Sequence, residues 1–260
     1  MSDLEASDAI ELNAVYYGQE FARLWERDFG TRPDTAIAVD CLDKFADGRP
    51  VLEFGIGTGR LALPLYRKGI DISGIEYSPW MVDELRTKPN GEHIPVYVGD
   101  FTKITVPGSF GLVLLASYTL FGLATQDDQV KCFENAAAHL QAGGIFVLEL
   151  CPTHGNIYEN GRAPMSLGAG WFEPERVAQN VWILLKQVDR ETQLVRSCRI
   201  SMEHEKVPRV RPFAGRFACP GEVDLMARIA GMRLCGRWSD WNLRPYSVDS
   251  LSYIVMYEKT

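Results

Sequence analysis

Residues 53–59, with the sequence Glu53-Phe-Gly-Ile-Gly-Thr-Gly59, decide the fold of this 260-residue chain. The three glycines follow a short apolar stretch, 51–54, and precede a stretch with helical spacing, 58–68. Glycine adopts positive φ without a steric penalty, so this turn can be tight and can bring the backbone close to a ligand. A strand, a glycine-rich turn and a helix in this order predict a nucleotide-type binding site.

Strands and helices alternate around this turn. The predicted strands are 51–54, 72–75, 94–98, 110–116 and 145–150, and the predicted helices are 58–68, 79–86 and 127–140. Such alternation predicts a doubly wound α/β fold with a mostly parallel sheet. After a helix at 220–230, the stretches 233–241 and 251–257 have no helix between them, which predicts an antiparallel hairpin added to the sheet.

The remaining segments suggest two additions to this core. An amphipathic helix at 12–28 and a second helix at 34–46 make residues 1–48 an N-terminal helical lid. Residues 152–219 interrupt the alternation, with strand-like runs at 181–188 and 194–202 around a polar turn. We expect an antiparallel β insertion there, acting as a substrate lid or as an interface between subunits of a homo-oligomer. The cofactor-binding core then comprises 49–151 and 220–260.

Acidic residues lie at the ends of three predicted strands. Glu53 lies within the first strand end, Glu76 ends the second strand 17 residues after Gly59, and Asp100 follows the third. The carboxyl ends of parallel strands meet at one sheet edge, so these acids should line one ligand site. A dinucleotide fingerprint would need glycine at position 60, where this chain has arginine, and a pyrophosphate would be repelled by Glu53.

An acid followed by three alternating glycines, with further acids at the next two strand ends, resembles the class I S-adenosylmethionine-dependent methyltransferases over residues 50–150. The resemblance implies a Rossmann-like sheet with strand order 3-2-1-4-5-7-6 and S-adenosylmethionine as cofactor, giving S-adenosylhomocysteine. The fourth strand departs from the family in having Gly111 where an acid is usual. The implied cofactor-binding residues are Glu53, Gly55, Gly57, Gly59, Glu76, Tyr77, Asp100, Phe101 and Ala116.

In this assignment the acids and rings have distinct partners. Glu53 and the turn carbonyls would accept from the ammonium of the cofactor, Glu76 from its ribose hydroxyls, and Asp100 from the adenine amino group. Tyr77 and Phe101 would lie against the adenine ring. Taken singly, Glu76 would be interpreted as a solvated carboxylate at a strand end, and Asp100 could be an ordinary turn aspartate.

The sequence of the predicted N-terminal helix indicates which class of molecule accepts the methyl group. Tyr17 and Trp25 lie eight residues apart, which resembles the Tyr-x7-Tyr lid helix of aminosugar and related natural-product N-methyltransferases, with tryptophan replacing the second tyrosine. The resemblance implies that Tyr17 approaches cofactor and substrate. Burial in the core is the alternative. His154, after the fifth strand, is the best-placed general base. Candidate acceptor-binding residues are Tyr17, Tyr118, Phe121 and Trp171.

Composition excludes several other functions. The net charge of −7 disfavours a nucleic-acid substrate, and no long apolar run predicts a membrane span. The first residues lack the apolar region of a secretory signal, and six cysteines without a C-x-x-C pair suit reduced core thiols, so we expect a cytoplasmic protein. No cluster has metal-ligand spacing, so no metal is expected.

The sequence therefore predicts methyl transfer to a small molecule, with N-methylation of an antibiotic or another secondary metabolite as the first hypothesis. Antibiotics that carry an amino sugar, or that are of the lincosamide type, are the substrate classes to test first. The alternatives left open are O- or C-methylation of a small aromatic or sugar substrate, an NAD-dependent oxidoreductase, and a non-catalytic binding protein with the same fold.

Overall fold

The computed structural model describes residues 18–30, 32–152, 166–168, 180–203, 208–247 and 249–260. These residues fall into two compact units. Residues 18–120, 126–152 and 219–260 form the first unit, and 121–125 with the described part of 153–218 form the second. Each unit is described by itself. In the described part of the chain, no helix has both the length and the apolar character needed to cross a membrane.

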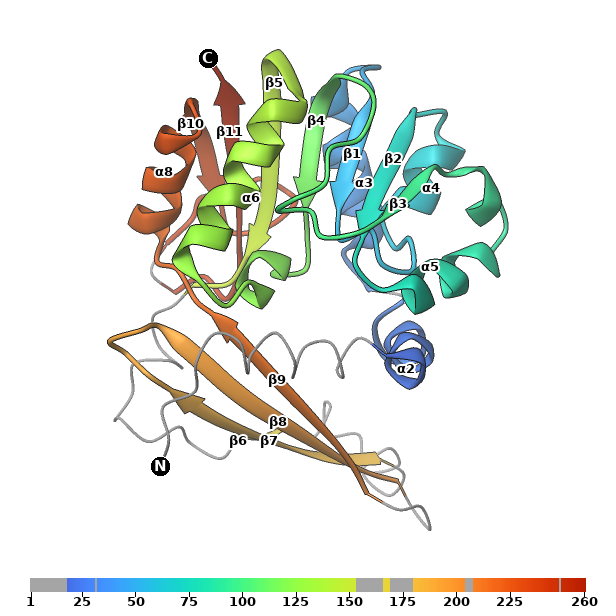
Figure 1. Ribbon diagram of the computed structural model, residues 1–260, viewed down its shortest axis with the longest axis vertical. Helices are drawn as coiled ribbons and strands as arrows, with labels where there is room; N and C mark the ends of the chain where they lie inside the picture. Colours follow the sequence, from blue (N-terminus) through green and yellow to red (C-terminus); the bar gives the residue numbers. More distant parts are fainter. Residues whose placement is uncertain (1–17, 31, 153–165, 169–179, 204–207, 248) are drawn as a thin grey trace. The chain divides into compact units, whose positions relative to one another are not determined.

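A seven-stranded sheet forms the centre of the first unit (Figure 1). Its strands are β1 (Val51–Phe54), β2 (Ile72–Glu76), β3 (Val96–Val98), β4 (Phe110–Leu115), β5 (Leu140–Leu150), β10 (Met232–Trp238) and β11 (Tyr253–Lys259). The order β10-β11-β5-β4-β1-β2-β3 confirms the predicted arrangement 3-2-1-4-5-7-6. The first five strands are parallel, and β11 is antiparallel to both β5 and β10.

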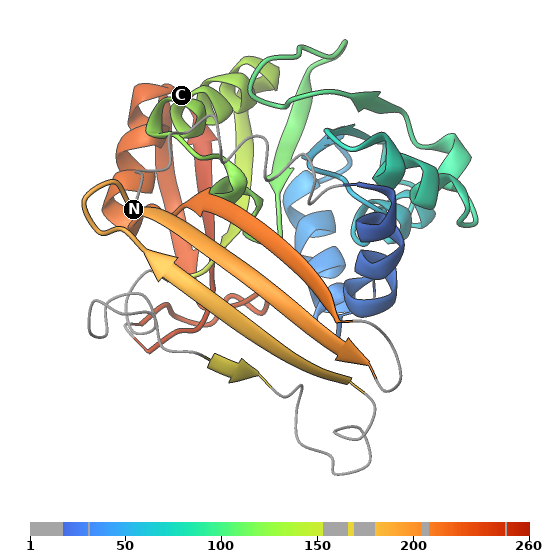
Figure 2. The ribbon, with the colours of Figure 1, turned by 60° about the horizontal axis from the view of Figure 1, so that its bottom comes forward.

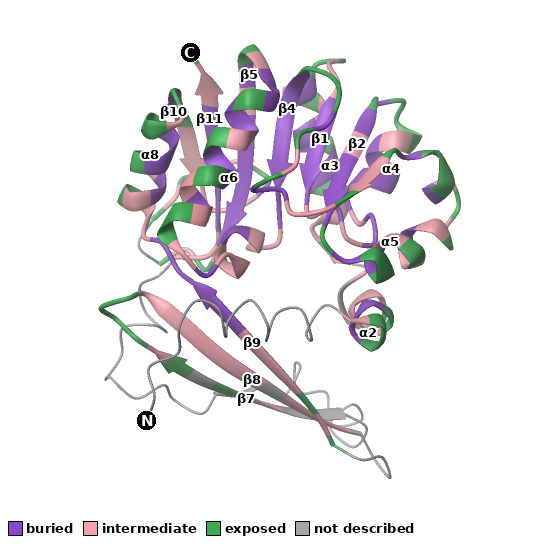
Figure 3. Cartoon of the chain, viewed as in Figure 1, coloured by how far each residue is buried: buried purple, intermediate pink, exposed green. Residues whose placement is uncertain are grey.

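Helices cover both faces of this sheet. They are α3 (Thr35–Ala46), α4 (Ala62–Arg67), α5 (Pro79–Arg86), α6 (Gln126–His139) and α8 (Pro220–Ile229), while α2 (Gln19–Phe29) packs against α5. On one face, α3 and α4 pack against Leu112, Leu114 and Val147. On the other, α6 brings Phe133 edge-on to Phe146, with ring centroids 5.1 Å apart. The central strands β1 and β4 are buried at every position, which explains their continuous apolar sequences (Figure 3).

Two predicted helices begin later than expected. Helix α4 begins at Ala62 rather than at residue 58, because Gly59 has φ of +81° and the preceding residues form a turn. Helix α2 begins at Gln19, since Gly18 is extended with ψ of 178°. The prediction of a helix over 12–28 is therefore wrong at Gly18, which is not helical. Residues 12–17 lie outside the described part of the chain.

The second unit contains a four-stranded antiparallel sheet in the order β6-β7-β8-β9 (Figure 2). Its strands are β6 (Ser166–Gly168), β7 (Asn180–Val188), β8 (Leu194–Glu203) and β9 (Arg209–Arg216). The predicted hairpin of β7 and β8 is confirmed. In its turn, Oδ1 of Asp189 accepts hydrogen bonds from the backbone N–H of Glu191 at 2.9 Å and of Thr192 at 3.3 Å. Strands β6 and β9 were not predicted, and β9 carries a proline and a glycine that weaken its signal.

Candidate functional site

The glycine turn follows β1 directly and needs glycine at each predicted position. Gly55, Gly57 and Gly59 have φ of +65°, +56° and +81°, a region that other residues rarely adopt. A Cβ at Gly59 would lie 2.4 Å from Cδ1 of Leu85, and one at Gly55 would lie 3.1 Å from Cγ2 of Thr119. The turn is therefore tight against both α5, which carries Leu85, and the loop that follows β4.

Glu53 is a buried acid beside this turn. Its side chain belongs to a residue that is only 4% exposed, and Oε2 has no hydrogen-bond partner among the described residues. Burial raises the pKa of Glu53 to about 8, an effect that Arg60 opposes and that Glu76 and Glu149 reinforce. A cation bound beside this buried carboxyl would stabilise its ionised form, so the unpaired oxygen suits a positively charged group of a ligand.

Glu76 ends β2 with its carboxylate turned toward the glycine turn. Its Oε2 accepts from the backbone N–H of Gly57 at 2.8 Å, and its Oε1 accepts from that of Ser78 at 2.9 Å. Burial raises the pKa of Glu76, while these backbone hydrogen bonds act in the opposite direction. The structure thus brings the two predicted strand-end acids, Glu53 and Glu76, to the same turn.

Asp100 lies after β3 and is half-buried. Its Oδ1 accepts from both the backbone N–H (2.8 Å) and the hydroxyl (2.7 Å) of Thr102, and its Oδ2 is 2.8 Å from Nζ of Lys103. Burial would raise the pKa of Asp100, but the contacts with Lys103 and Thr102 hold it below its ordinary value. This carboxylate is therefore ionised and ready to accept a further hydrogen bond at neutral pH.

The two aromatic residues predicted beside the adenine differ in their surroundings. Tyr77 is 52% exposed at the end of β2. Phe101 is buried and stacks on Phe54 in the core, with ring centroids 5.5 Å apart and an interplanar angle of 15°. One face of the Phe101 ring is thus already covered by protein, whereas Tyr77 offers its side chain to solvent.

The loop after β4 has a strained backbone. Ala116 is buried, and the next two residues, Ser117 and Tyr118, have φ of +56° and +62° although neither is glycine. Such conformations cost about 1–3 kcal/mol each and concentrate at functional sites. Burial, followed by the charge of Glu149, raises the pKa of Tyr118 to about 12, so this phenol keeps its proton at neutral pH.

Glu149 on β5 holds this strained loop. Its Oε2 accepts from the backbone N–H of Ser117 at 2.8 Å, and its backbone carbonyl accepts from the N–H of Tyr118 at 3.1 Å. The side chain of Glu149 is only 3% exposed. An ionised group at this depth needs paired charges.

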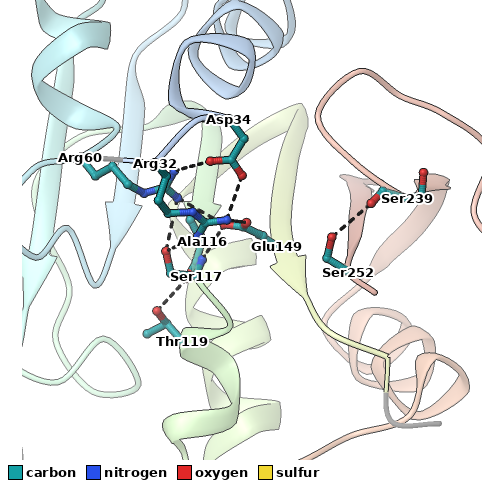
Figure 4. Close-up of polar contacts among 9 residues, drawn as sticks. All are labelled: Arg32, Asp34, Arg60, Ala116, Ser117, Thr119, Glu149, Ser239 and Ser252. Atoms are coloured by element: carbon teal, nitrogen blue, oxygen red, sulfur yellow. Dashed lines mark hydrogen bonds and ion pairs between the residues drawn. The ribbon is translucent and has the colours of Figure 1, made fainter. Parts of the chain in front are cut away.

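Two arginines supply these charges (Figure 4). Nη2 of Arg32 lies 2.8 Å from Oε1 of Glu149 and 2.8 Å from Oδ2 of Asp34, and Nη2 of Arg60 lies 3.3 Å from Oε2 of Glu149. Both guanidinium groups also reach the hydroxyl of Ser117, at 3.5 and 3.3 Å. The cluster joins the segment before α3, the glycine turn, β4 and β5 at one edge of the sheet.

Sequence reasoning missed three members of this cluster, Arg32, Asp34 and Glu149, and considered Arg60 only as a departure from the dinucleotide fingerprint. One signal was present in the sequence. Glu149 is the single charged residue in the apolar run 145–150, Ile-Phe-Val-Leu-Glu-Leu. A charge within a strand that is buried on both faces calls for a specific partner.

A pocket of about 240 Å³ lies in the first unit on the α3 side of Glu149. Its lining includes Asp34 and Ile37 at the start of α3, together with Trp241 and Arg244 from the segment between β10 and β11. Both apolar and charged side chains line it, so it can hold part of a small polar molecule.

Several predicted site residues are not brought together with these. Tyr17, His154 and Trp171 lie outside the described residues. Phe121 belongs to the second unit, on the short 3-10 helix η2 (Thr119–Gly122), and is partly buried. In the described ranges, no group of three or more histidine, cysteine, aspartate or glutamate residues could hold a metal ion.

The described residues fit the zwitterionic methionine end of the expected cofactor. The unpartnered Oε2 of Glu53 suits an ammonium, and the glycine turn admits close approach of a ligand to the backbone. The guanidinium groups of Arg32 and Arg60 suit a carboxylate. One sheet edge therefore offers a carboxyl group for the ammonium and guanidinium groups for the carboxylate of an amino acid.

Comparison with known proteins places this geometry in context. Residues 51–144 match a family model described as a methyltransferase domain. The structure of the CcbJ methyltransferase from Streptomyces caelestis is similar to this chain, with a TM-score of 0.84 and 31% sequence identity. That similarity covers 94% of this chain and 98% of the other.

Two further proteins are similar. Cypemycin N-terminal methyltransferase from a Streptomyces species is 25% identical over 213 residues, which cover 82% of this chain and 84% of that protein. The structure of S-adenosylmethionine-bound CalS10, an amino pentose methyltransferase from Micromonospora echinaspora involved in calicheamicin biosynthesis, has a TM-score of 0.65 and 16% identity over the full length of both chains. At that identity the likeness concerns the fold alone.

Proposed function

The chain belongs to the class I S-adenosylmethionine-dependent methyltransferases, and from this premise we propose that it methylates a nitrogen atom of a small natural product. The observation that carries the proposal is the similarity, across 82% of the chain, to a protein named for methylating an N-terminus. Membership of this family decides against the NAD-dependent oxidoreductase and the non-catalytic binding protein. O- and C-methylation remain as alternative outcomes of the test below.

We assign the cofactor contacts to the sheet edge. Glu53 would accept from the ammonium, Glu76 from the ribose hydroxyls and Asp100 from the adenine amino group, with Tyr77 against the exposed side of the ring. Gly55, Gly57 and Gly59 would let the backbone approach, and Ala116 and Phe101 would complete the walls. Arg32 and Arg60 would donate hydrogen bonds to the cofactor carboxylate, drawn partly away from Glu149.

The protein's contribution to the reaction would be alignment and exclusion of water. S-adenosylmethionine supplies an activated methyl group, which an uncharged amine can take by in-line displacement. The loop at Ser117 and Tyr118, fixed by Glu149, would form the wall beside the reacting atoms. Tyr118 keeps its proton at neutral pH, so it can donate a hydrogen bond but cannot serve as the base.

We also propose roles for the residues that would bind the methyl acceptor. Tyr17, His154 and Trp171 would respectively approach the methyl group, accept a proton from the methylated amine and cover the substrate, and Phe121 would line its path. We also propose that the insertion at 152–219 is a substrate lid or a subunit interface, and that the segment 1–48 is a helical lid. The pocket beside Glu149 offers room for part of a polar acceptor.

Transfer of a labelled methyl group tests the proposal. The purified protein is incubated with S-adenosylmethionine carrying a 13C-methyl group and with amino sugars, short peptides with free N-termini, and matched analogues in which hydroxyl replaces the amine. The proposal predicts N-13CH3 products, recognised by their NMR shifts, from the amines alone. Products carrying only O-methyl or C-methyl groups would contradict it.

A further inference from the structure

Thr58, at the centre of the glycine turn, is held by groups from outside the turn. It is 2% exposed and lies between Gly57 and Gly59, both with positive φ. Its hydroxyl donates to Oε2 of Glu26 on α2 at 2.7 Å, and its backbone carbonyl accepts from Nζ of Lys88 at 2.6 Å.

Glu26 and Lys88 also bind each other. Nζ of Lys88 lies 2.5 Å from the same Oε2 of Glu26, and the two side chains are only 31% and 20% exposed. Three hydrogen bonds thus form a closed triangle among α2, the turn after β1 and the segment after α5. Partial burial makes such a charge-assisted triangle stronger than an ion pair in water.

This triangle is distinct from the contacts that dock α2 on its neighbour. Helix α2 packs along α5, where Arg23 and Glu84 form a separate ion pair at 3.7 Å. That pair does not involve the turn. Docking of the helix alone does not require the contacts of Glu26 and Lys88 with Thr58, which fix its hydroxyl and its backbone carbonyl.

A turn with three left-handed glycines is costly to order. Glycine loses more conformational freedom than any other residue when its backbone is fixed, and a ligand that orders a loop loses affinity for that reason. A turn already held at its central residue avoids most of this cost. The triangle also transmits any displacement of α2 to the turn.

We propose that Glu26 and Lys88 are positioning residues for the cofactor, which hold the glycine turn in its binding conformation through Thr58 and couple α2 to it. Neither residue is among those assigned above to contact the cofactor. Both should nevertheless affect its affinity, and they should act as one unit.

A double-mutant cycle on cofactor affinity tests the proposal, with S-adenosylhomocysteine as the probe in isothermal titration calorimetry. The variants are Glu26→Gln, Lys88→Met and the two combined. We expect each single change to raise Kd about fivefold and the combined change to raise it little further, because the second removes an interaction that the first has already broken. Lys88→Arg should restore most of the affinity.

Two control variants separate positioning from general stability. Lys68→Met removes another lysine that bridges acids, Asp40 and Asp43 of α3, away from the turn. Glu84→Gln breaks the other ion pair of α2. Both controls should leave Kd within twofold of the wild-type value, even where urea unfolding shows lower stability.

Three results would overturn the proposal. The first is a Kd that does not change in Lys88→Met despite a lower free energy of unfolding, since that is a purely structural role. The second is a combined variant whose loss equals the product of the two single losses. If Lys88→Met does not fold, Thr58→Val takes its place, because it removes the hydrogen bond from Thr58 to Glu26, and the third result is then an unaltered affinity in this variant. Absence of binding to the wild-type protein would instead remove the cofactor assignment itself.

Discussion

Lowering the pH from 8 to 6 should weaken the binding of S-adenosylhomocysteine about 50-fold, because Glu53 must be ionised to meet the ammonium of the ligand. Burial raises the pKa of Glu53 to about 8 in the free protein. Ionising it at pH 6 therefore costs about 2.7 kcal/mol, at 1.36 kcal/mol per pH unit. Glu53 is ionised in roughly half of the free protein at pH 8 and in about 1% at pH 6. The ratio of these two fractions is the predicted change in affinity of about 50-fold.

The stability of the free protein should change in the opposite direction. Because the pKa of Glu53 in the folded state lies above its ordinary value of 4.5, the folded state holds a proton that the unfolded chain releases. This contribution to the free energy of unfolding is complete below pH 4.5 and is lost as the pH rises toward 8. As the pH rises between these two values, the free protein should become less stable while its affinity for S-adenosylhomocysteine increases.

Calorimetric titrations at pH 6, 7 and 8, in buffers with different ionisation enthalpies, measure both the affinity and the protons released. Close to one proton should leave per ligand bound at pH 6. Glu53→Gln should bind weakly with little dependence on pH, and it corrects for titration of the ligand itself. Glu84→Gln on the surface of α5 should behave as the wild type. A wild-type affinity that does not vary from pH 6 to 8 would refute the reasoning.

Three further predictions concern the same sheet edge. Glu149→Gln should lower the free energy of unfolding by about 3 kcal/mol in urea titrations, because the guanidinium groups of Arg32 and Arg60 lose their buried carboxylate partner. A decrease of less than ~1 kcal/mol would contradict a stabilising role of this charge cluster. Gly59→Ala should destabilise the protein more than Gly48→Ala, as both have positive φ but only at Gly59 would the Cβ meet Leu85, and equal melting temperatures would contradict this. Asp100→Asn should raise the Kd for S-adenosylhomocysteine about tenfold with unchanged binding stoichiometry, and unaltered affinity would remove this residue from the adenine site.

Much of the fold could be predicted from local sequence. The strand ends, the glycine turn and the acids Glu53, Glu76 and Asp100 each have a signal within a few residues, because burial on both faces of a strand and positive φ impose their own residue types. Even the antiparallel final hairpin was visible, since no helix separates its strands. The start of α4 was missed because helical spacing extends back through Gly59, whose backbone is not helical.

The charge cluster could not be predicted in the same way. Arg32, Arg60 and Glu149 are far apart in sequence, and their pairing exists only once α3, the glycine turn and β5 meet at the sheet edge. The strain at Ser117 and Tyr118 also has no sequence signal, because residues other than glycine adopt such φ values only when other contacts hold them. The identity of Phe101 likewise did not indicate that one face of its ring stacks on Phe54.

A crystal structure of the complex with S-adenosylhomocysteine tests the central claim most directly. The account predicts the amino group of the ligand within hydrogen-bond distance of Glu53, its ribose at Glu76 and its adenine beside Asp100, with the carboxylate near Arg60. A ligand bound elsewhere, or one whose ribose and amino group lie away from Glu76 and Glu53, would contradict the assignment of this sheet edge as the cofactor site.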